Sequence, residues 1–386
     1  MIPYGRQEIT QNDVDAVVKI LRQDFLTQGP AVPQFEKTVL DYCGSSYGVA
    51  VNSATSALHI ACLALGLGEG DVLWTSPNTF VASANCARYC GAQVDFVDID
   101  SSTYNMSIDH LAAKLDVAAK EGKLPKVVVP VHFAGQPCDM ASIHMLSQKF
   151  DFKIIEDGSH AIGARYSDSK IGSCLHSDIT VFSFHPVKII TTGEGGMALT
   201  NDKNIAEKMS RLRTHGITSD QALMEHRPSK EIWNYQQIEL GFNYRMTDIQ
   251  AALGISQMQR LDEVIRLRHE IALKYNEELS SLPIITPLQR ANTYSSFHLY
   301  PIRLPESSSL KSQSEVYHEL RLNGVAANLH YIPVHRQPYY EKQGFKIGDF
   351  PEAEKFHREV LSLPIFPSLS TDQQNKVIKL LTQSLN

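Results

Sequence analysis

The stretch DITVFSFHPVKIITTGEGG, residues 178–196, decides how the rest of the chain is interpreted. Ile179, Val181 and Phe182 alternate with small polar residues, which predicts a mostly buried strand that ends before the proline. Lys188 follows in a run of β-branched residues. In most such lysines the stem packs and the ammonium reaches water. The alternative is that burial disfavours the ammonium and frees the amine to form a Schiff base.

The surroundings of Lys188 favour this alternative. Ser183 supplies a hydroxyl near the strand end, and the glycines at 193, 195 and 196 supply a tight turn. A hydroxyl and a turn rich in glycine indicate an anion beside the lysine. We therefore expect this segment to combine a reactive amine with part of an anion site.

Composition excludes several classes of function. The chain has 386 residues, of which 43% are hydrophobic and 20% charged, as in an ordinary soluble enzyme with more than one domain. A net charge of -6 without a long Lys/Arg cluster argues against nucleic-acid binding. No apolar stretch approaches the roughly 20 residues of a membrane helix, and the start is unlike a signal peptide, so we expect a cytoplasmic protein. The cysteine and histidine spacings predict no metal site.

The order of elements predicts an α/β fold. Between residues 47 and 200, short apolar strands alternate with helices, which is typical of a mostly parallel sheet with helices on both faces. The apolar spacing over residues 247–279 predicts one long helix that leaves this large domain. We divide the chain into three parts: an N-terminal arm and helix (1–26), a large domain (27–260), and a small C-terminal α/β domain (261–386).

Ligands of parallel sheets bind beyond the carboxyl ends of the strands, so residues just after a strand are the first candidates. Thr55 and Ser56 open a helix whose N–H groups and dipole can hold a phosphate, although Ser53 before them would also serve as an ordinary cap. Asp157 ends a strand and could cap the next helix. If an aromatic nitrogen base lies there, the same carboxylate keeps the ring nitrogen protonated.

Phe80 and His160 complete the candidate set at these strand ends. Phe80 could stack on a planar ring, although core packing explains most single phenylalanines. His160 could flank the ring or support Asp157. A phosphate held by Thr55, Ser56 and Ser183, a ring nitrogen on Asp157 and an aldehyde carbon on Lys188 together describe pyridoxal phosphate.

The sequence disfavours another class of enzyme. Gly66-x-Gly68-x-Gly70 could suggest a nicotinamide dehydrogenase, but it follows a helix and precedes a strand, the reverse of a dinucleotide-binding loop. We interpret it as a helix stop and a turn.

Three motifs carry a resemblance to a known family. IIEDGSHAIGARY (154–166), VFSFHPVKIITTGEGGMALTND (181–202) and GFNYRMTDIQAALG (241–254) resemble the DegT/DnrJ/StrS family of nucleotide-sugar aminotransferases. The resemblance runs over essentially the whole chain. It implies the aspartate aminotransferase (type I) fold and pyridoxal 5′-phosphate as the cofactor.

The resemblance also implies residue roles. Lys188 would carry the cofactor, Asp157 would bind the pyridine nitrogen, and the phosphate would lie on Thr55, Ser56 and Ser183. Phe80 and His160 would flank the ring. Asn243 would reach the phosphate of a neighbouring subunit, which implies a homodimer with shared active sites.

The substrate expectation rests on further stretches. LTQGPAVPQFE (26–36), VNSATSALHIA (51–61) and LHYIPVHRQPYY (329–340) are similar to family members of pseudaminic acid synthesis. These aminate a UDP-4-keto-6-deoxy-hexosamine with L-glutamate as the donor. Another UDP- or dTDP-linked 4-keto or 3-keto sugar is the alternative substrate. The alternative to an enzyme is a regulatory protein of the same fold that binds sugar nucleotides without turnover. By position, the candidates for diphosphate binding are Arg6, Arg245, His330 and Tyr331.

Overall fold

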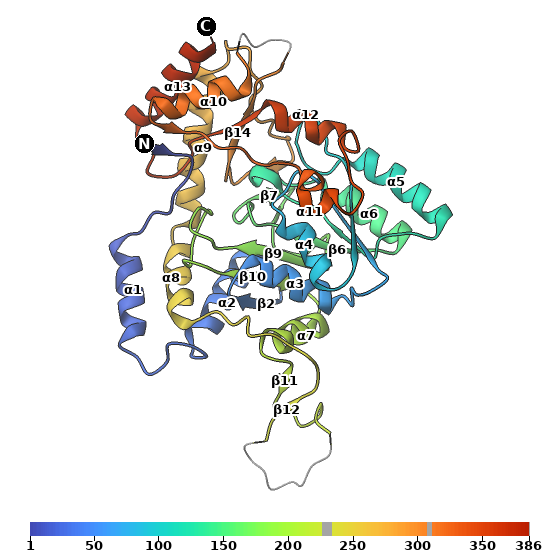
Figure 1. Ribbon diagram of the computed structural model, residues 1–386. Helices are drawn as coiled ribbons and strands as arrows, with labels where there is room; N and C mark the ends of the chain where they lie inside the picture. The colour runs from blue at the N-terminus through green and yellow to red at the C-terminus, as the bar shows by residue number, and fades with distance from the viewer. Residues whose placement is uncertain (226–233, 307–310, 386) are drawn as a thin grey trace.

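The computed structural model describes residues 1–225, 234–306 and 311–385. Its centre is a seven-stranded sheet in the order β2-β10-β9-β6-β5-β3-β4 (Figure 1). β10 runs antiparallel to its two neighbours, and the other adjacent pairs are parallel, so the predicted mostly parallel sheet is confirmed. The strands of this sheet are β2 (Tyr47–Val51), β3 (Val72–Thr75), β4 (Gln93–Phe96), β5 (Val127–Val129), β6 (Lys153–Asp157), β9 (Ile179–Ser183) and β10 (Gly196–Thr200).

Helices cover both faces of this sheet, because alternate strand residues point to opposite sides. In β9, Ile179 and Val181 join one apolar cluster and Phe182 joins another. In residues 1–225, 234–306 and 311–385, no helix is both long enough and apolar enough to span a bilayer. The helices of this part are α2 (Ala31–Cys43), α3 (Ala54–Ala64), α4 (Ala82–Tyr89), α5 (Ile108–Glu121), α6 (Met140–Phe150), α7 (Lys203–Arg213) and α8 (Asp248–Met258).

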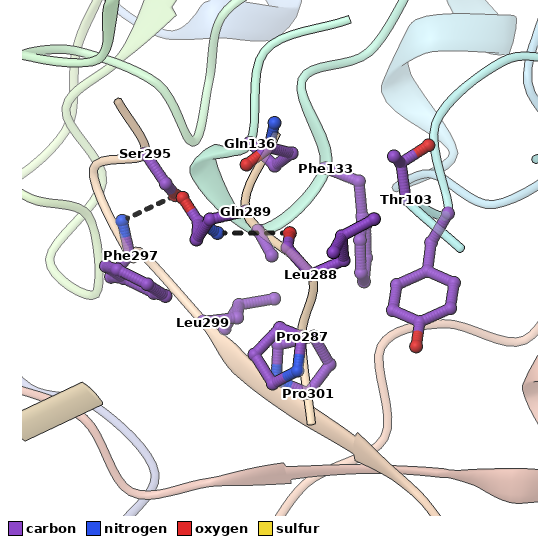
Figure 2. Close-up of a pocket in the computed structure, with 12 residues that line it drawn as sticks. Thr103, Phe133, Gln136, Pro287, Leu288, Gln289, Ser295, Phe297, Leu299 and Pro301 are labelled. Atoms are coloured by element: carbon purple, nitrogen blue, oxygen red, sulfur yellow. Dashed lines mark hydrogen bonds between the residues drawn. The ribbon is translucent and has the colours of Figure 1, made fainter. Parts of the chain in front are cut away.

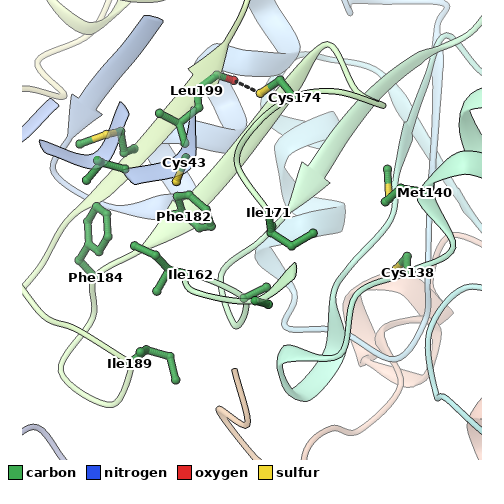
Figure 3. Packing of buried hydrophobic residues seen from close by; sticks show 14 of the residues in the cluster. Cys43, Cys138, Met140, Ile162, Ile171, Cys174, Phe182, Phe184, Ile189 and Leu199 are labelled. Atoms are coloured by element: carbon green, nitrogen blue, oxygen red, sulfur yellow. Dashed lines mark hydrogen bonds between the residues drawn. The ribbon is translucent and has the colours of Figure 1, made fainter. Parts of the chain in front are cut away.

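The segment after β9 is anchored by its apolar residues. Figure 3 shows Phe182, Phe184 and Ile189 within one buried cluster, together with Ile162 and Leu199. The chain leaves the strand at Ser183 and has no regular structure around Pro186, while Phe184, Ile189 and Ile190 stay buried. The core therefore holds the backbone on both sides of Lys188.

A third apolar cluster lies in the C-terminal part, and α9 connects it with the sheet (Figure 1). The first residues of the chain also belong there, since β1 pairs with β15. The helix α9 contributes residues both to this cluster and to a cluster of the large domain. The domain boundary at residue 260 therefore stays a prediction. The elements are β1 (Ile2–Pro3), α9 (Leu261–Glu278), β14 (Tyr300–Arg303), α10 (Gln313–Leu322), β15 (Val325–Ala326), α11 (Pro338–Glu341), α12 (Pro351–Glu359), β16 (Val360–Leu363) and α13 (Thr371–Leu385).

Shorter elements decorate this framework. The N-terminal helix α1 packs against α8, and the β11–β12 pair projects from the molecule below α7 (Figure 1). The remaining elements are α1 (Gln11–Leu21), β7 (Arg165–Tyr166), β8 (Ser169–Lys170), β11 (Ile217–Thr218), β12 (Gln236–Gln237), β13 (Thr293–Tyr294) and the 3₁₀ turns η1 (Phe133–Gly135) and η2 (Val334–Arg336).

Two local expectations had different outcomes. The glycine motif is a helix stop and a turn, as predicted: Gly66 and Gly70 have positive φ between α3 and β3. The single helix predicted over 247–279 is wrong, since α8 ends at Met258 and α9 begins at Leu261. Arg260 between them has φ -118° and ψ 15°, and its guanidinium donates to Asp13 in the first turn of α1 at 2.9 Å. The helical spacing continues across this break, so sequence periodicity did not reveal it.

Candidate active site

A cavity of about 920 Å³ opens at the carboxyl ends of the central strands. Its walls come from the ends of β2, β6 and β9, from the loop after β3, and from residues 328–331 of the C-terminal part. Nine of the predicted site residues line it: Thr55, Ser56, Phe80, Asp157, His160, Ser183, Lys188, His330 and Tyr331. The strand-end rule thus identified one shared location for side chains that are far apart in sequence.

Lys188 brings an unpaired amine to this cavity. Among the residues that the structure describes, no carboxylate lies within ion-pair distance of its Nζ. Burial lowers the pKa of the Lys188 amine to about 8, against the opposing effect of Asp157. Near neutral pH a useful fraction of this amine is therefore unprotonated and can act as a nucleophile or a base.

Asp157 is oriented by two donors. The Ser83 hydroxyl donates to Oδ2 at 2.6 Å, and the Ser159 N–H donates to Oδ1 at 3.0 Å. Ser83 lies in the first turn of α4 and exchanges a second hydrogen bond with Thr79, at 2.8 Å. Phe80 was predicted from the sequence and Ser83 was not. A hydroxyl in the first turn of the helix after β3 was the available signal, because that helix starts at the same sheet edge.

The start of α3 is an open anion site. Ser53 caps the helix by accepting the Ser56 N–H at 3.2 Å, and the Ser56 hydroxyl donates to Asn52 Oδ1 at 2.6 Å. The N–H groups of Ala54 and Thr55 have no acceptor in the described part of the chain. Thr55 and the backbone therefore offer the free donors, and Ser56 supports the loop that holds them.

Gly196 permits this arrangement. It begins β10 directly beside the start of α3, and a Cβ at this position would lie 2.5 Å from the Ala54 nitrogen. A larger residue would push the helix start away from the strand. Ser183, on the neighbouring strand, is buried, and its hydroxyl has no partner in the described residues. It therefore adds a further donor near the start of α3.

Aromatic side chains form the opposite walls. Phe80 is 58% exposed, which is unusual for a phenylalanine that packs in a core and fits a side chain that lines an open cavity. His160 is buried, and its ring lies against that of His298, with centroids 4.3 Å apart and the two planes tilted by 38°. Burial, together with Lys188 and His330, holds the pKa of His160 well below its ordinary value. The cavity thus presents a neutral imidazole.

Three predicted residues lie outside the cavity of this single chain. Asn243 is exposed and bridges Thr214 through the backbone. Arg245 bridges Val51 in the same way, and neither side chain lines the cavity. The exposed Arg6 donates to Ser368 at 3.2 Å and lies over a phenylalanine ring. One chain alone therefore does not bring these cationic and amide donors to the site.

A second pocket, lined in part by the 133–136 turn, does not share this chemistry. Figure 2 shows it between Phe133, Leu299 and Pro301, with Gln136 at one end. Its lining residues include one ionisable side chain, Tyr104, and no amine or carboxylate. The Lys188 amine and the Asp157 carboxylate line the larger cavity instead.

Comparisons with known proteins identify the family of this chain. The sequence model of the DegT/DnrJ/EryC1/StrS aminotransferase family matches residues 7–382. The chain is 38% identical over 381 residues to the spore coat polysaccharide biosynthesis protein SpsC of Bacillus subtilis (98% of this chain, 95% of that protein). It is 38% identical over 366 residues to a UDP-4-amino-4,6-dideoxy-N-acetyl-beta-L-altrosamine transaminase of Campylobacter jejuni (94% and 92%).

Solved structures give the same picture. Helicobacter pylori PseC, an aminotransferase of pseudaminic acid biosynthesis, superposes with a TM-score of 0.90 at 28% identity over 100% of this chain and 99% of that chain. The PLP form of the putative sugar aminotransferase Spr1654 from Streptococcus pneumoniae gives 0.88 at 28% identity, with 100% of both chains covered. The expected aspartate aminotransferase-like fold is thereby confirmed.

Proposed function

Because this chain belongs to the DegT/DnrJ/EryC1/StrS aminotransferase family, we propose that it uses pyridoxal 5′-phosphate (PLP) to transfer an amino group from L-glutamate to a nucleotide-linked keto sugar. The observation that carries this proposal is the unpaired Lys188 amine, which lies in one cavity with Asp157 and the open start of α3. Each of these three features matches one functional group of the cofactor.

The cavity fits PLP in chemistry. The free N–H groups of Ala54 and Thr55 and the Ser183 hydroxyl suit a phosphate monoester at a helix N-terminus. The carboxylate of Asp157, held by Ser83, suits a protonated ring nitrogen. The Lys188 amine, with a pKa of about 8, suits an aldehyde.

When bound, PLP supplies an electron sink for the electron pair that remains after a proton leaves the amino acid Cα. The residues of this chain have simpler tasks. The neutral amine of Lys188 takes the proton from the Cα of glutamate in the first half-reaction. In the second half-reaction it delivers a proton to the sugar carbon that receives the amino group. Asp157 keeps the ring nitrogen protonated, and the Phe80 and His160 walls orient the ring and limit its contact with water.

For the acceptor, we propose a UDP-4-keto-6-deoxy-hexosamine that becomes UDP-4-amino-4,6-dideoxy-N-acetyl-β-L-altrosamine. The support is the 38% identity to the Campylobacter jejuni transaminase and the fold shared with PseC. The equal identity to SpsC favours a second candidate, another UDP- or dTDP-linked 4-keto or 3-keto sugar. A few pocket contacts decide between such sugars.

We also propose that the working unit is a homodimer. The resemblance assigns Asn243 to the cofactor phosphate, yet in this chain Asn243 is exposed and outside the cavity. A second copy that presents its own Asn243 to this cavity reconciles the two observations. Arg245, two residues on, would then also reach the diphosphate from the partner subunit.

The purified protein tests the proposal directly. With PLP it should turn yellow, and borohydride should attach the cofactor to the peptide that contains Lys188, as read by mass spectrometry. Incubation with glutamate and a panel of UDP- and dTDP-linked keto sugars should give one amino sugar and 2-oxoglutarate. Lys188→Ala should abolish both results. A wild-type protein in which borohydride attaches no PLP to Lys188 would refute the proposal.

A further inference from the structure

Two neighbouring residues of the cavity wall, His330 and Tyr331, differ in what they can offer a ligand. The His330 Nε2 accepts from the Asn328 side-chain amide at 3.3 Å, so the ring hydrogen is on Nδ1 and is donated to the Ser362 hydroxyl at 2.9 Å. Both ring nitrogens therefore have protein partners. Burial lowers the pKa of His330 to about 3, so the ring is neutral as well. His330 has no free donor for a bound molecule.

His160 sets the direction of the hydrogen bond to Tyr331. The Ala134 N–H can only donate, and it points to His160 Nδ1 at 3.3 Å. Because His160 is neutral, its single ring hydrogen must then be on Nε2. That nitrogen lies 3.1 Å from the Tyr331 hydroxyl oxygen. The histidine is therefore the donor in this pair and the tyrosine is the acceptor.

The hydroxyl hydrogen of Tyr331 is consequently not used in the hydrogen bond with His160. No acceptor in residues 1–225, 234–306 or 311–385 takes it, and Tyr331 lines the same cavity as Lys188. Burial raises the pKa of Tyr331, so the hydroxyl keeps its hydrogen. Phe80 and Phe133 flank the ring with centroids 6.3 Å away, which limits its movement. The O–H is thus available and its direction is constrained.

We propose that the Tyr331 hydroxyl donates a hydrogen bond to an oxygen of the bound molecule and positions that oxygen beside Lys188. His160 fixes the direction, because its own hydrogen bond occupies the acceptor side of the hydroxyl. This inference rests on the proposed function. It predicts an oxygen that accepts, either the phenolic oxygen attached to the cofactor ring or the carbonyl oxygen of the keto substrate. The chemistry is the same for both. A group that can only donate, such as an ammonium, would find no partner here. Tyr331 rather than His330 therefore selects for the oxygen.

Tyr331→Phe tests this in the PLP-loaded, full-length protein, with Tyr42→Phe as the matched control. Tyr42 also loses a hydroxyl, but one that donates to Asp262 outside the cavity. If the acceptor is the cofactor oxygen, Tyr331→Phe shifts the pH dependence of the visible absorbance without any substrate. If it is the keto sugar, the spectrum and the glutamate half-reaction stay unchanged. The half-reaction with UDP-4-keto sugar then slows by about three- to tenfold.

The direction of the bond has its own test. His160→Phe keeps a ring but removes the donor, so the Tyr331 hydroxyl can turn and the effect of Tyr331→Phe should shrink in that background. An equal effect in both backgrounds would overturn the fixed direction. A Tyr331→Phe protein that matches wild type in the spectrum and both half-reactions would overturn the donor role. These outcomes are distinct from failure of the proposed function, in which wild type itself forms no linkage with PLP.

Discussion

Ser83 is the residue whose role depends most directly on one contact. Its hydroxyl is 2.6 Å from Asp157 Oδ2, and a hydrogen bond to a charged group contributes about 1.5–3 kcal/mol. We expect Ser83→Ala to leave the carboxylate less well oriented and to weaken PLP binding about tenfold or more. Titration of the apoprotein with PLP, followed by quenching of protein fluorescence, measures this affinity.

A serine on the surface, far from the Asp157 carboxylate in its contacts, provides the control for that experiment. Ser280 donates its hydroxyl to the Glu277 carbonyl on the surface, so Ser280→Ala changes the same atoms away from the cavity. Its PLP affinity should equal that of wild type. Equal affinities for all three proteins would show that Asp157 needs no support from Ser83.

The lowered pKa of the Lys188 amine predicts that the capture of PLP depends on pH. Its pKa is lowered to about 8, so the amine is mostly protonated and unreactive at lower pH and mostly neutral above it. The rate at which the apoprotein captures PLP should rise roughly tenfold per pH unit below 8 and level off above it. Stopped-flow absorbance records this rate. A midpoint near the ordinary lysine value of about 10.4 would show that burial has no such effect.

At the scale of elements, the contact between β10 and the start of α3 shapes the proposed phosphate site at that helix start. A Cβ on Gly196 would lie 2.5 Å from both the Ala54 nitrogen and the Ser53 carbonyl carbon. Both are backbone atoms, so the helix start must move. We expect Gly196→Ala to destabilise the fold by about 1–3 kcal/mol and to weaken the binding of PLP and of inorganic phosphate.

Thermal unfolding and phosphate titration of the variant measure these two effects. Gly68→Ala is the control, because a Cβ there meets no atom within 4 Å and its φ is not positive. It should unfold near the wild-type temperature. If Gly196→Ala binds phosphate as tightly as Gly68→Ala, the start of α3 is not the anion site.

At the scale of the whole molecule, the exposed Asn243 predicts sites that are shared between two copies. Lys188→Ala and Asn243→Ala should each be inactive alone. In a mixed dimer, one site combines the intact Lys188 of one subunit with the intact Asn243 of the other. Refolding an equal mixture should therefore restore about a quarter of the wild-type activity, because half of the dimers carry one intact site.

The mixing experiment is read by the rate of 2-oxoglutarate formation and by the mass of the particle in solution. Mixing Lys188→Ala with Asp157→Ala is the control. Both residues line the cavity of the same chain, so no pairing of those two subunits creates an intact site. Activity in the control, or a monomeric wild-type protein, would contradict the shared site.

The sequence by itself determined the fold class and the shared location of the main reactive side chains. Buried strands alternate with amphipathic helices, and parallel strands bring their carboxyl ends to one edge, so Asp157, Ser183 and Lys188 could be placed together from local patterns. It also determined the turn at Gly66 and Gly70, because glycine favours the left-handed conformation that ends α3. These features depend on residues that are close in the chain or on a rule for the whole sheet.

Only the tertiary structure decided which polar atoms remain free. Ser83 reaches Asp157 across 74 positions, and Arg260 reaches Asp13 across 247, and no local spacing records such pairs. The Ser56 donors are used within the protein, while those of Thr55 are open. The tautomer of His160, and with it the donor character of Tyr331, follows from an N–H 26 positions away. Hydrogen-bond partners are set by packing in three dimensions, whereas periodicity reports only which face of an element is buried.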